Sequence, residues 1–176
     1  SGILSGKPTN SDVGTHNIKL QVIDSQGATV EQSFTIKVEN TNDKPIISNS
    51  PLTKVKEGEP YSYTLKATDP DQGDTITFDK VSIPSWLSFD PKTGILSGKP
   101  SNNDVGTNNV KLTVTDNNGA TVYQEFSIDV INVNDLPIIT STPHTLIKED
   151  SNYYYNIKAS DLDQGETLNF SSPKLP

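Results

Sequence analysis

The sequence repeats itself at one fixed spacing, and this repeat constrains its fold more than any other feature. Gly2-Ile3-Leu4-Ser5-Gly6-Lys7-Pro8 recurs as Gly94-Ile95-Leu96-Ser97-Gly98-Lys99-Pro100, a shift of 92 residues (94 minus 2). At this shift, residues 1–45 match residues 93–137 at 29 of 45 positions, and residues 46–84 match residues 138–176 at 17 of 39. A period near 90 is too long for solenoid repeats of about 20 to 50 residues. It suits an independently folded domain, so we expect a tandem array of such domains.

The phase of the repeat predicts the domain boundaries. With junctions at Asn42-Asp43-Lys44-Pro45 and Asn134-Asp135-Leu136-Pro137, residues 1–45 are the second half of a repeat, 46–137 a complete repeat and 138–176 the first half of a third. The favoured interpretation is a window within a longer array. The alternative is a filament in which the end segments of different chains pair head to tail, because together they lack only the stretch that matches Ser85 to Lys92.

Alternating apolar and polar residues predict strands in the complete repeat. Residues 61–67, 75–80, 110–114 and 122–130 have a period of two, which is typical of a strand with one buried face. Asn118-Gly119 lies between the last two segments and indicates a hairpin, because both residues tolerate positive φ. No segment has a sustained helical period. About seven strands per repeat therefore predict a two-sheet antiparallel sandwich.

The amino-acid composition excludes or argues against several classes of site and partner. The chain has no Cys and only two His, so disulfides, thiolate metal sites and Cys nucleophiles are excluded. Its formal net charge is −8 and its 14 basic residues are all Lys, which argues against a nucleic-acid partner. The apolar runs are too short for membrane insertion in this segment. No targeting signal is recognisable, so we expect targeting to lie elsewhere.

Acidic residues gather in loops that strand polarity places at the ends of the repeats. The turn at residues 69–74 and Asp116 fall at one end of a repeat, whereas Glu57, Asp104 and the exit linker fall at the other. The first junction is predicted to gather Asp12, Asn42, Asp43, Asp69, Asp71, Asp74 and Asp116. The second is predicted to gather Glu57, Asp104, Asn134, Asp135, Asp161, Asp163 and Glu166.

These carboxylates would repel one another unless a cation lay among them. Ca²⁺ is the predicted ion, because it accepts roughly 6 to 8 oxygen ligands in flexible geometry. Zinc would require Cys or clustered His. An EF-hand is excluded, because Lys80 and Ser172 occupy the twelfth positions, where a bidentate Glu is needed. The alternative is that these Asx-rich turns only satisfy their own backbone groups.

Short sequences spread over the whole chain carry a family resemblance. They are Val55-Lys56-Glu57, Ala67-Thr68-Asp69-Pro70-Asp71-Gln72-Gly73-Asp74, Pro84-Ser85-Trp86-Leu87-Ser88-Phe89-Asp90, Thr93 to Pro100, Asp104-Val105-Gly106-Thr107, Val114-Thr115-Asp116 and Asn132-Val133-Asn134-Asp135. With them the chain resembles tandem cadherin-like repeats of bacterial surface proteins and adhesins, in the dystroglycan-type cadherin-like and Putative Ig families. The resemblance implies an all-β fold of tandem Ig-like or cadherin-like antiparallel β-sandwich repeats, each of about 92 residues.

The resemblance also implies roles for individual residues. Glu57 resembles the cadherin glutamate of the first strand, and Asp69 and Asp71 resemble the Asp-x-Asp pair of calcium ligands. Asp74 takes the position of a later Asn or Asp ligand, and Asp116 resembles the ligand after the penultimate strand. Asn134-Asp135 resembles the linker between cadherin repeats. Where vertebrate cadherins have an acidic pair, this chain has only Asp104, followed by Val105 and Gly106. Fewer charges imply fewer ions, about one or two per junction, with an affinity of roughly 10⁻⁴ to 10⁻³ M.

Three classes of function follow, and the first is favoured. It is a structural repeat of a long extracellular bacterial adhesin, surface or matrix protein, secreted or on the cell surface, with Ca²⁺ stiffening the junctions between neighbouring repeats. The second is a calcium-dependent module that binds polysaccharide or identical units on another chain. Trp86 is expected in the core and not in sugar stacking, and the outward Tyr123 has Glu31 as its counterpart, so no aromatic platform recurs. An enzyme is not expected, because His16 and His144 fall outside the repeated design.

Overall fold

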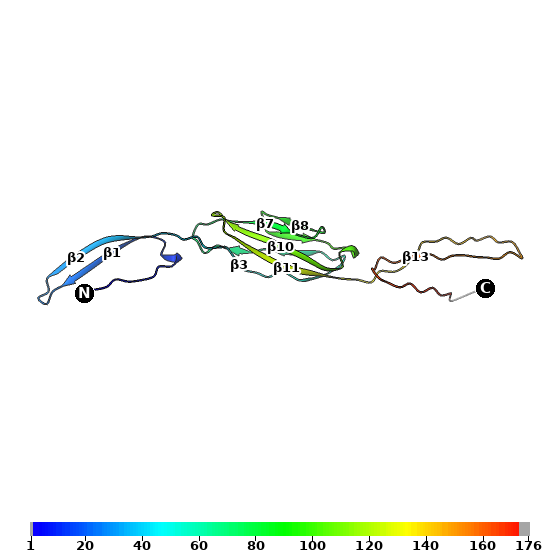
Figure 1. Ribbon diagram of the computed structural model, residues 1–176, viewed down its shortest axis with the longest axis horizontal. Helices are drawn as coiled ribbons and strands as arrows, with labels where there is room; N and C mark the ends of the chain where they lie inside the picture. The colour runs from blue at the N-terminus through cyan, green and yellow to red at the C-terminus, as the bar shows by residue number, and fades with distance from the viewer. Residues whose placement is uncertain (1, 173–176) are drawn as a thin grey trace.

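The chain forms three parts in a row. The computed structural model describes residues 2–172, and it shows a central sandwich between two thinner end segments (Figure 1). The hairpin of β1 (Gly14–Ile23) and β2 (Thr29–Val38) lies at one end of the elongated molecule, and the segment that contains β13 (Ala159–Ser160) lies at the other. Within residues 2–172, no helix is long and apolar enough to cross a membrane.

Nine strands make up the central unit, residues 46–131. They are β3 (Ile46–Ile47), β4 (Lys54–Lys56), β5 (Tyr61–Thr64), β6 (Ala67–Thr68), β7 (Ile76–Ser82), β8 (Leu87–Asp90), β9 (Ile95–Gly98), β10 (Gly106–Asp116) and β11 (Thr121–Ile131). The end segments contain β1 (Gly14–Ile23), β2 (Thr29–Val38), β12 (Ile138–Ile139) and β13 (Ala159–Ser160). Two short 3-10 turns, η1 (Asn10–Asp12) and η2 (Asn102–Asp104), precede β1 and β10.

The strands of the central unit form two main sheets. One has the order β4-β11-β10-β7, the other has the order β5-β9-β8, and β3 pairs with β6. The pairs are antiparallel except β4 with β11, which is parallel. The predicted all-β sandwich is therefore confirmed, with one parallel pair in a sheet expected to be wholly antiparallel.

One predicted strand is broken in two. Residues 61–67 keep their alternating burial, but β5 ends at Thr64 and β6 starts at Ala67. Between them, the backbone N–H of Leu65 donates to the carbonyl oxygen of Gly94 at 2.9 Å, and that of Lys66 donates to Asn49 Oδ1 at 2.9 Å. These bonds replace the regular ladder where the chain changes its partner from β9 to β3.

The core lies between the sheets of the central unit. Leu96, Leu112, Val114 and Ile128 are fully buried, and their inward positions follow the alternation of β9, β10 and β11. Trp86 packs against this core, as predicted from the sequence. Its Nε1 donates to Asn108 Oδ1 at 3.0 Å, and its ring meets that of Tyr61 edge to face at a centroid distance of 5.9 Å.

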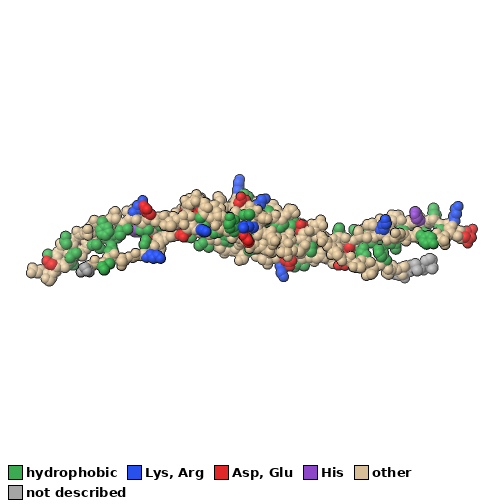
Figure 2. All heavy atoms as spheres, in the orientation of Figure 1, with side chains coloured by type: hydrophobic (Ala, Val, Ile, Leu, Met, Phe, Trp, Pro, Cys, Tyr) green, Lys and Arg blue, Asp and Glu red, His purple; other side chains and the backbone are tan. Residues whose placement is uncertain are grey.

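The end segments have the same local strand pairing as the central unit, but their apolar side chains are more exposed. The β1–β2 pair has the register Val22↔Val30, which matches Val114↔Val122 in the β10–β11 pair. Val22 is 67% exposed, whereas Val114 is fully buried. Figure 2 shows hydrophobic side chains along both end segments. The predicted boundaries at residues 1 and 176 lie outside the described residues, and the inner boundaries stay a prediction.

Candidate metal centres at the two junctions

The same Asx turn precedes both candidate sites. Asp69 Oδ1 accepts a hydrogen bond from the backbone N–H of Asp71 at 2.9 Å, and Asp161 Oδ1 accepts one from Asp163 at 3.0 Å. In each turn the side chain of the second aspartate, Asp71 or Asp163, accepts a hydrogen bond from the linker that precedes its unit. The backbone N–H of Asp43 donates to Asp71 Oδ2 at 2.7 Å, and that of Asp135 donates to Asp163 Oδ2 at 2.8 Å. Each linker is thus tied to the unit that follows it.

The first cluster consists of Asp69, Asp74 and Asp116, whose carboxylate oxygens lie within 4.8 Å of one another. Asp116 ends β10 and is only 5% exposed. A side-chain hydrogen bond from Asn42, at 2.9 Å, and backbone N–H donors of the hairpin keep the pKa of Asp116 below its usual value. Asp69 Oδ2 is buried and has no hydrogen-bond partner in the described part of the chain.

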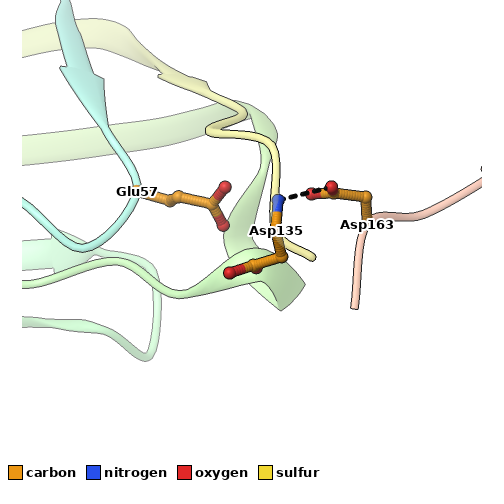
Figure 3. Close-up of side chains that lie close together, drawn as sticks. All are labelled: Glu57, Asp135 and Asp163. Atoms are coloured by element: carbon orange, nitrogen blue, oxygen red, sulfur yellow. Dashed lines mark hydrogen bonds between the residues drawn. The ribbon is translucent and has the colours of Figure 1, made fainter. Parts of the chain in front are cut away.

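The second cluster consists of Glu57, Asp135 and Asp163, again within 4.8 Å of one another (Figure 3). They come from the central unit, the linker and the following segment, respectively. Glu57 is 7% exposed and Asp163 is 6% exposed. Glu57 Oε1 accepts the backbone N–H of Val133 at 2.5 Å. Within residues 2–172, Glu57 Oε2 and Asp163 Oδ1 are buried without a partner.

These buried oxygens fit a cation. A buried carboxylate oxygen without a hydrogen bond is costly, because its hydration is lost and not replaced. Three carboxylates held together also repel one another. A hard cation that prefers oxygen ligands would correct both defects, and each cluster supplies three carboxylates. The interpretation that these turns only satisfy their own backbone therefore leaves Glu57 Oε2, Asp69 Oδ2 and Asp163 Oδ1 unexplained.

The structure brings some of the predicted ligands together and leaves others apart. Asn42, Asp43 and Asp71 join the first cluster through hydrogen bonds, and Asp161 supports Asp163 in the second. The amide of Asn134 donates to the carbonyl oxygen of Asp135, so Asn134 shapes the linker. Glu166 is exposed and belongs to neither cluster within the described residues.

Asp12 and Asp104 occupy a different local setting. Asp12 Oδ2 accepts hydrogen bonds from the backbone and the hydroxyl of Thr9, and Asp104 Oδ2 accepts the same pair from Ser101. These bonds cap η1 and η2. The backbone hydrogen bond from Thr9 is the main cause of a lowered pKa at Asp12. Their predicted role as ligands stays a prediction, and neither lies in a cluster described above.

Asn10 and Asn102 contact the linkers and were not predicted. Asn10 Nδ2 donates to Asp43 Oδ2 at 2.8 Å, and Asn102 Nδ2 donates to Asp135 Oδ2 at 2.6 Å. The signal was present in the sequence, because both copies of the repeat have Asn at this position, two residues before Asp12 and Asp104. Neither Asn lies beside the linker in the sequence, so only the folded chain brings them to Asp43 and Asp135.

A family model confirms the resemblance. The model described as "Putative Ig domain" matches residues 1–39 and 44–131, which is more than half of the chain. The chain belongs to the Putative Ig domain family. This membership agrees with the sandwich, and the two matched ranges are separated by residues 40–43 of the first linker.

This Putative Ig chain is distantly similar in sequence to a bacterial adhesin and similar in structure to cadherin domains. It is 26% identical over 136 residues to "Serine-rich adhesin for platelets" of Staphylococcus aureus, a match that covers 74% of the chain and 6% of that protein. PcdhgB3 cadherin domains align with a TM-score of 0.63 at 22% identity, covering 93% of this chain and 44% of that one. Protocadherin Gamma B7 aligns with a TM-score of 0.56 at 25% identity, covering 89% and 42%. An endo-fucoidan hydrolase aligns only with a TM-score of 0.46.

The exposed aromatic surface of this Putative Ig unit is small. Tyr123 is 56% exposed, and Lys111 Nζ lies 4.5 Å from the centroid of its ring. Lys111 also pairs with Glu125 at 2.7 Å. A cation over the ring occupies a face on which a sugar would stack.

Proposed function

We propose that this chain is a structural repeat segment of a long extracellular bacterial adhesin or surface or matrix protein, in which Ca²⁺ bound at the junctions between repeats stiffens the rod. The chain spans about 6% of the length of the curated adhesin that it matches, so the activity of any whole protein is part of this proposal. The proposal includes no catalytic role.

One observation carries the proposal. Glu57, Asp135 and Asp163 belong to a domain, a linker and the next segment, and two of them are buried with an unpartnered oxygen in the described structure. When bound, Ca²⁺ would supply the positive charge that these oxygens lack. Because the ligands come from both sides of the linker, each bound ion removes bending freedom at the junction. Without an ion, the carboxylates repel and only hydrogen bonds such as Asp135 to Asp163 hold the junction.

Binding of polysaccharide remains a weaker alternative. Its support is the exposed Tyr123, but Lys111 covers one face of that ring, and Trp86 is committed to the core through Asn108.

The test compares thermal unfolding in calcium, in chelator and in magnesium, followed by circular dichroism. We expect calcium to raise the midpoint, since a ligand that binds only the folded state stabilises it, by about 2.7 kcal/mol at a concentration of 100 times Kd. Glu57→Gln should lose the part of this gain that comes from the second cluster, because the first cluster of Asp69, Asp74 and Asp116 is unchanged. In chelator, the same variant should unfold no earlier than the parent chain, because it removes repulsion within the cluster.

Glu59→Gln is the matched control, since it makes the same change two residues away at an exposed position. It should keep the full calcium response. Equal midpoints of the parent chain in calcium and in chelator would rule out the junction sites as calcium sites.

A further inference from the structure

Three loops meet at the first junction through the amide of Asn118. Its Nδ2 donates to Asn42 Oδ1 at 2.6 Å and to Asp74 Oδ2 at 2.9 Å. Asn42 belongs to the first linker, Asp74 to the turn at residues 69–74, and Asn118 to the tip of the β10–β11 hairpin. One side chain therefore joins the linker to two loops of the complete central unit that follows it.

A second amide closes these contacts into a hydrogen-bonded ring. Asn42 Nδ2 donates to Asp116 Oδ2 at 2.9 Å, and the backbone N–H of Asn118 donates to Asp116 Oδ1 at 2.9 Å. The hydrogen bond from Asn42 is the largest cause of the lowered pKa of Asp116, so the ring favours the ionised carboxylate. Two of the three carboxylates of the first cluster, Asp74 and Asp116, thus accept hydrogen bonds from this pair of asparagines.

The carboxylates fix which way both amides point. An ionised carboxylate only accepts hydrogen bonds, so the NH₂ group of Asn118 must face Asp74, and that of Asn42 must face Asp116. Asn42 Oδ1 is then the atom that faces Asn118 Nδ2. A carbonyl oxygen has two lone pairs, and this hydrogen bond uses one of them. The other is available to a cation.

The ring places a fourth oxygen beside the first cluster. Asn118 Nδ2 contacts both Asn42 Oδ1 and an oxygen of Asp74, so these two oxygens are close neighbours. The carboxylates of Asp69, Asp74 and Asp116 lie within 4.8 Å of one another, and Asp69 Oδ2 is buried without a hydrogen-bond partner among the described residues. Ca²⁺ takes roughly 6 to 8 oxygen ligands, including Asn carbonyl oxygens. Asn42 Oδ1 therefore extends a donor set that three carboxylates leave incomplete.

Asn118 acts on these ligands without being one of them. Its NH₂ group donates hydrogen bonds and has no lone pair to offer to a cation. It therefore orients Asn42 and Asp74 from outside the cluster. Replacing a group that hydrogen-bonds to metal ligands in this way typically lowers metal affinity about 10- to 100-fold. Asn118 and Asn42 are 76 residues apart in sequence, so their contact forms only in the folded junction.

We propose that Asn118 is a positioning residue of the first junction. Its amide holds the linker residue Asn42 and the cluster residue Asp74 in place for a divalent cation, and it holds the linker to the hairpin tip when no cation is bound. The cation part rests on the function proposed above. The linker part does not, because it depends on hydrogen bonds that form without an ion.

The first experiment measures backbone amide exchange in chelator by NMR. The N–H of Asp43 donates to Asp71 Oδ2 at 2.7 Å at the first junction, and that of Asp135 donates to Asp163 Oδ2 at 2.8 Å at the second. Asn118→Ala should speed exchange at Asp43, because the linker loses its bond to the hairpin tip. Exchange at Asp135 should stay the same, which makes it an internal control. Unchanged exchange at Asp43 would overturn the linker part.

Gln26→Ala is the matched control variant. Gln26 holds the position of Asn118 in the β1–β2 hairpin, 92 residues earlier. Its backbone N–H donates to Asp24 Oδ1 at 2.9 Å, as that of Asn118 donates to Asp116 Oδ1. The substitution removes an amide from the same kind of turn, at a residue that belongs to neither cluster in the described structure. It should leave both the exchange at Asp43 and the calcium affinity unchanged.

Calorimetric calcium titration tests the cation part. All chains in this comparison carry Glu57→Gln, which removes a carboxylate of the second cluster so that the heats report the first. Asn118→Ala should weaken calcium binding about 10- to 100-fold. Equal affinities with and without this substitution would overturn the positioning role and leave the proposed function intact. Absence of calcium binding by the unsubstituted chain would overturn the proposed function together with the cation part, whereas amide exchange decides the linker part separately.

Asn118→Asp separates hydrogen bonding from packing. It keeps the size of the side chain but replaces the donor by a carboxylate that faces Asp74 Oδ2 and Asn42 Oδ1. In chelator this variant should unfold at a lower temperature than Asn118→Ala, because like charges repel. In calcium its midpoint should rise more than that of Asn118→Ala, because the cation offsets the repulsion. Equal midpoints of the two variants in chelator would contradict a role for Asn118 as a donor.

Discussion

Tyr61 and Tyr153 hold the same position in the repeat, and the comparison shows how strongly surroundings decide a side chain's chemistry. Tyr61 is almost fully buried, and its hydroxyl donates to the carbonyl oxygen of Leu52 at 2.8 Å. Burial raises the pKa of Tyr61 to about 12 and also raises the pKa of Tyr63. Tyr153 is half exposed. The alternating pattern predicted a strand only around Tyr61, and in the structure Tyr153 lies outside any strand.

The raised pKa of Tyr61 predicts alkaline unfolding. Because the folded-state pKa lies above the unfolded value of about 10, its contribution to stability is complete below pH 10 and is lost as the pH rises toward 12. Urea unfolding midpoints from circular dichroism should fall over this range. Tyr61→Phe should flatten the fall, although it loses a hydrogen bond worth about 0.5–1.5 kcal/mol. An unchanged pH dependence in Tyr61→Phe would contradict this, and the exposed Tyr123→Phe is the control.

The acidic residues show where prediction from sequence ended. Repetition at loop ends predicted Asp69, Asp116 and Asp163 at the junctions, and the structure brings Asp69 near Asp116 and Asp163 near Glu57. Repetition could not separate these from Asp104, because the spacing is the same for a cluster residue and for a residue that caps its own turn. The difference lies in local hydrogen bonds: Ser101 offers two donors to Asp104 at 2.8 and 2.7 Å.

At the scale of elements, the alternation of apolar and polar residues predicted most strands of the central unit, but it did not predict the break between β5 and β6. The register of β10 with β11 follows the hairpin at Asn118-Gly119, as expected. The break between β5 and β6 could not be predicted, because it arises from Asn49 and Gly94, which are distant in sequence from Leu65. Tertiary hydrogen bonds override the local pattern there.

Two glycines at the same repeat position allow a matched test of this packing. A Cβ on Gly98 would overlap the carbonyl oxygen of Trp86, whereas one on Gly6 would meet nothing within 4 Å. Gly98→Ala should therefore destabilise the central unit by about 1–3 kcal/mol, since β9 and the start of β8 must move apart. Gly6→Ala should change the unfolding midpoint little. Chemical denaturation followed by Trp86 fluorescence measures both, and equal midpoints would contradict the close approach.

At the scale of the whole molecule, the linkers decide the shape. Each linker is short and is held to the next unit by one backbone hydrogen bond, from Asp43 or from Asp135. The repeat of 92 residues predicted a chain of beads, and the structure shows an elongated arrangement (Figure 1). The angle between units at each junction could not be predicted from the sequence, because it depends on tertiary contacts such as the hydrogen bond from Asn102 to Asp135.

Calcium should restrict bending between the units. Small-angle scattering of the chain should give a larger maximum dimension and a narrower distance distribution in calcium than in chelator. The physical reason is that Glu57 and Asp163 would then share one ion across the linker. The same maximum dimension in both buffers would contradict a stiffened junction.

The single parallel pair determines how the central unit responds to mechanical load. The chain enters the unit at β3, continues into β4 and leaves through β11. The neighbouring strands β4 and β11 run in the same direction with the register Lys54↔Asp129, Val55↔Val130 and Lys56↔Ile131. Tension on the two ends of the unit therefore pulls β4 and β11 in opposite directions along their length. The hydrogen bonds from Asp129 to Thr53 and from Glu57 to Ile131, at 2.8 and 3.0 Å, are loaded in shear and must fail together. Antiparallel neighbours loaded at one end would open one bond at a time, so this pairing makes the unit a force-bearing link.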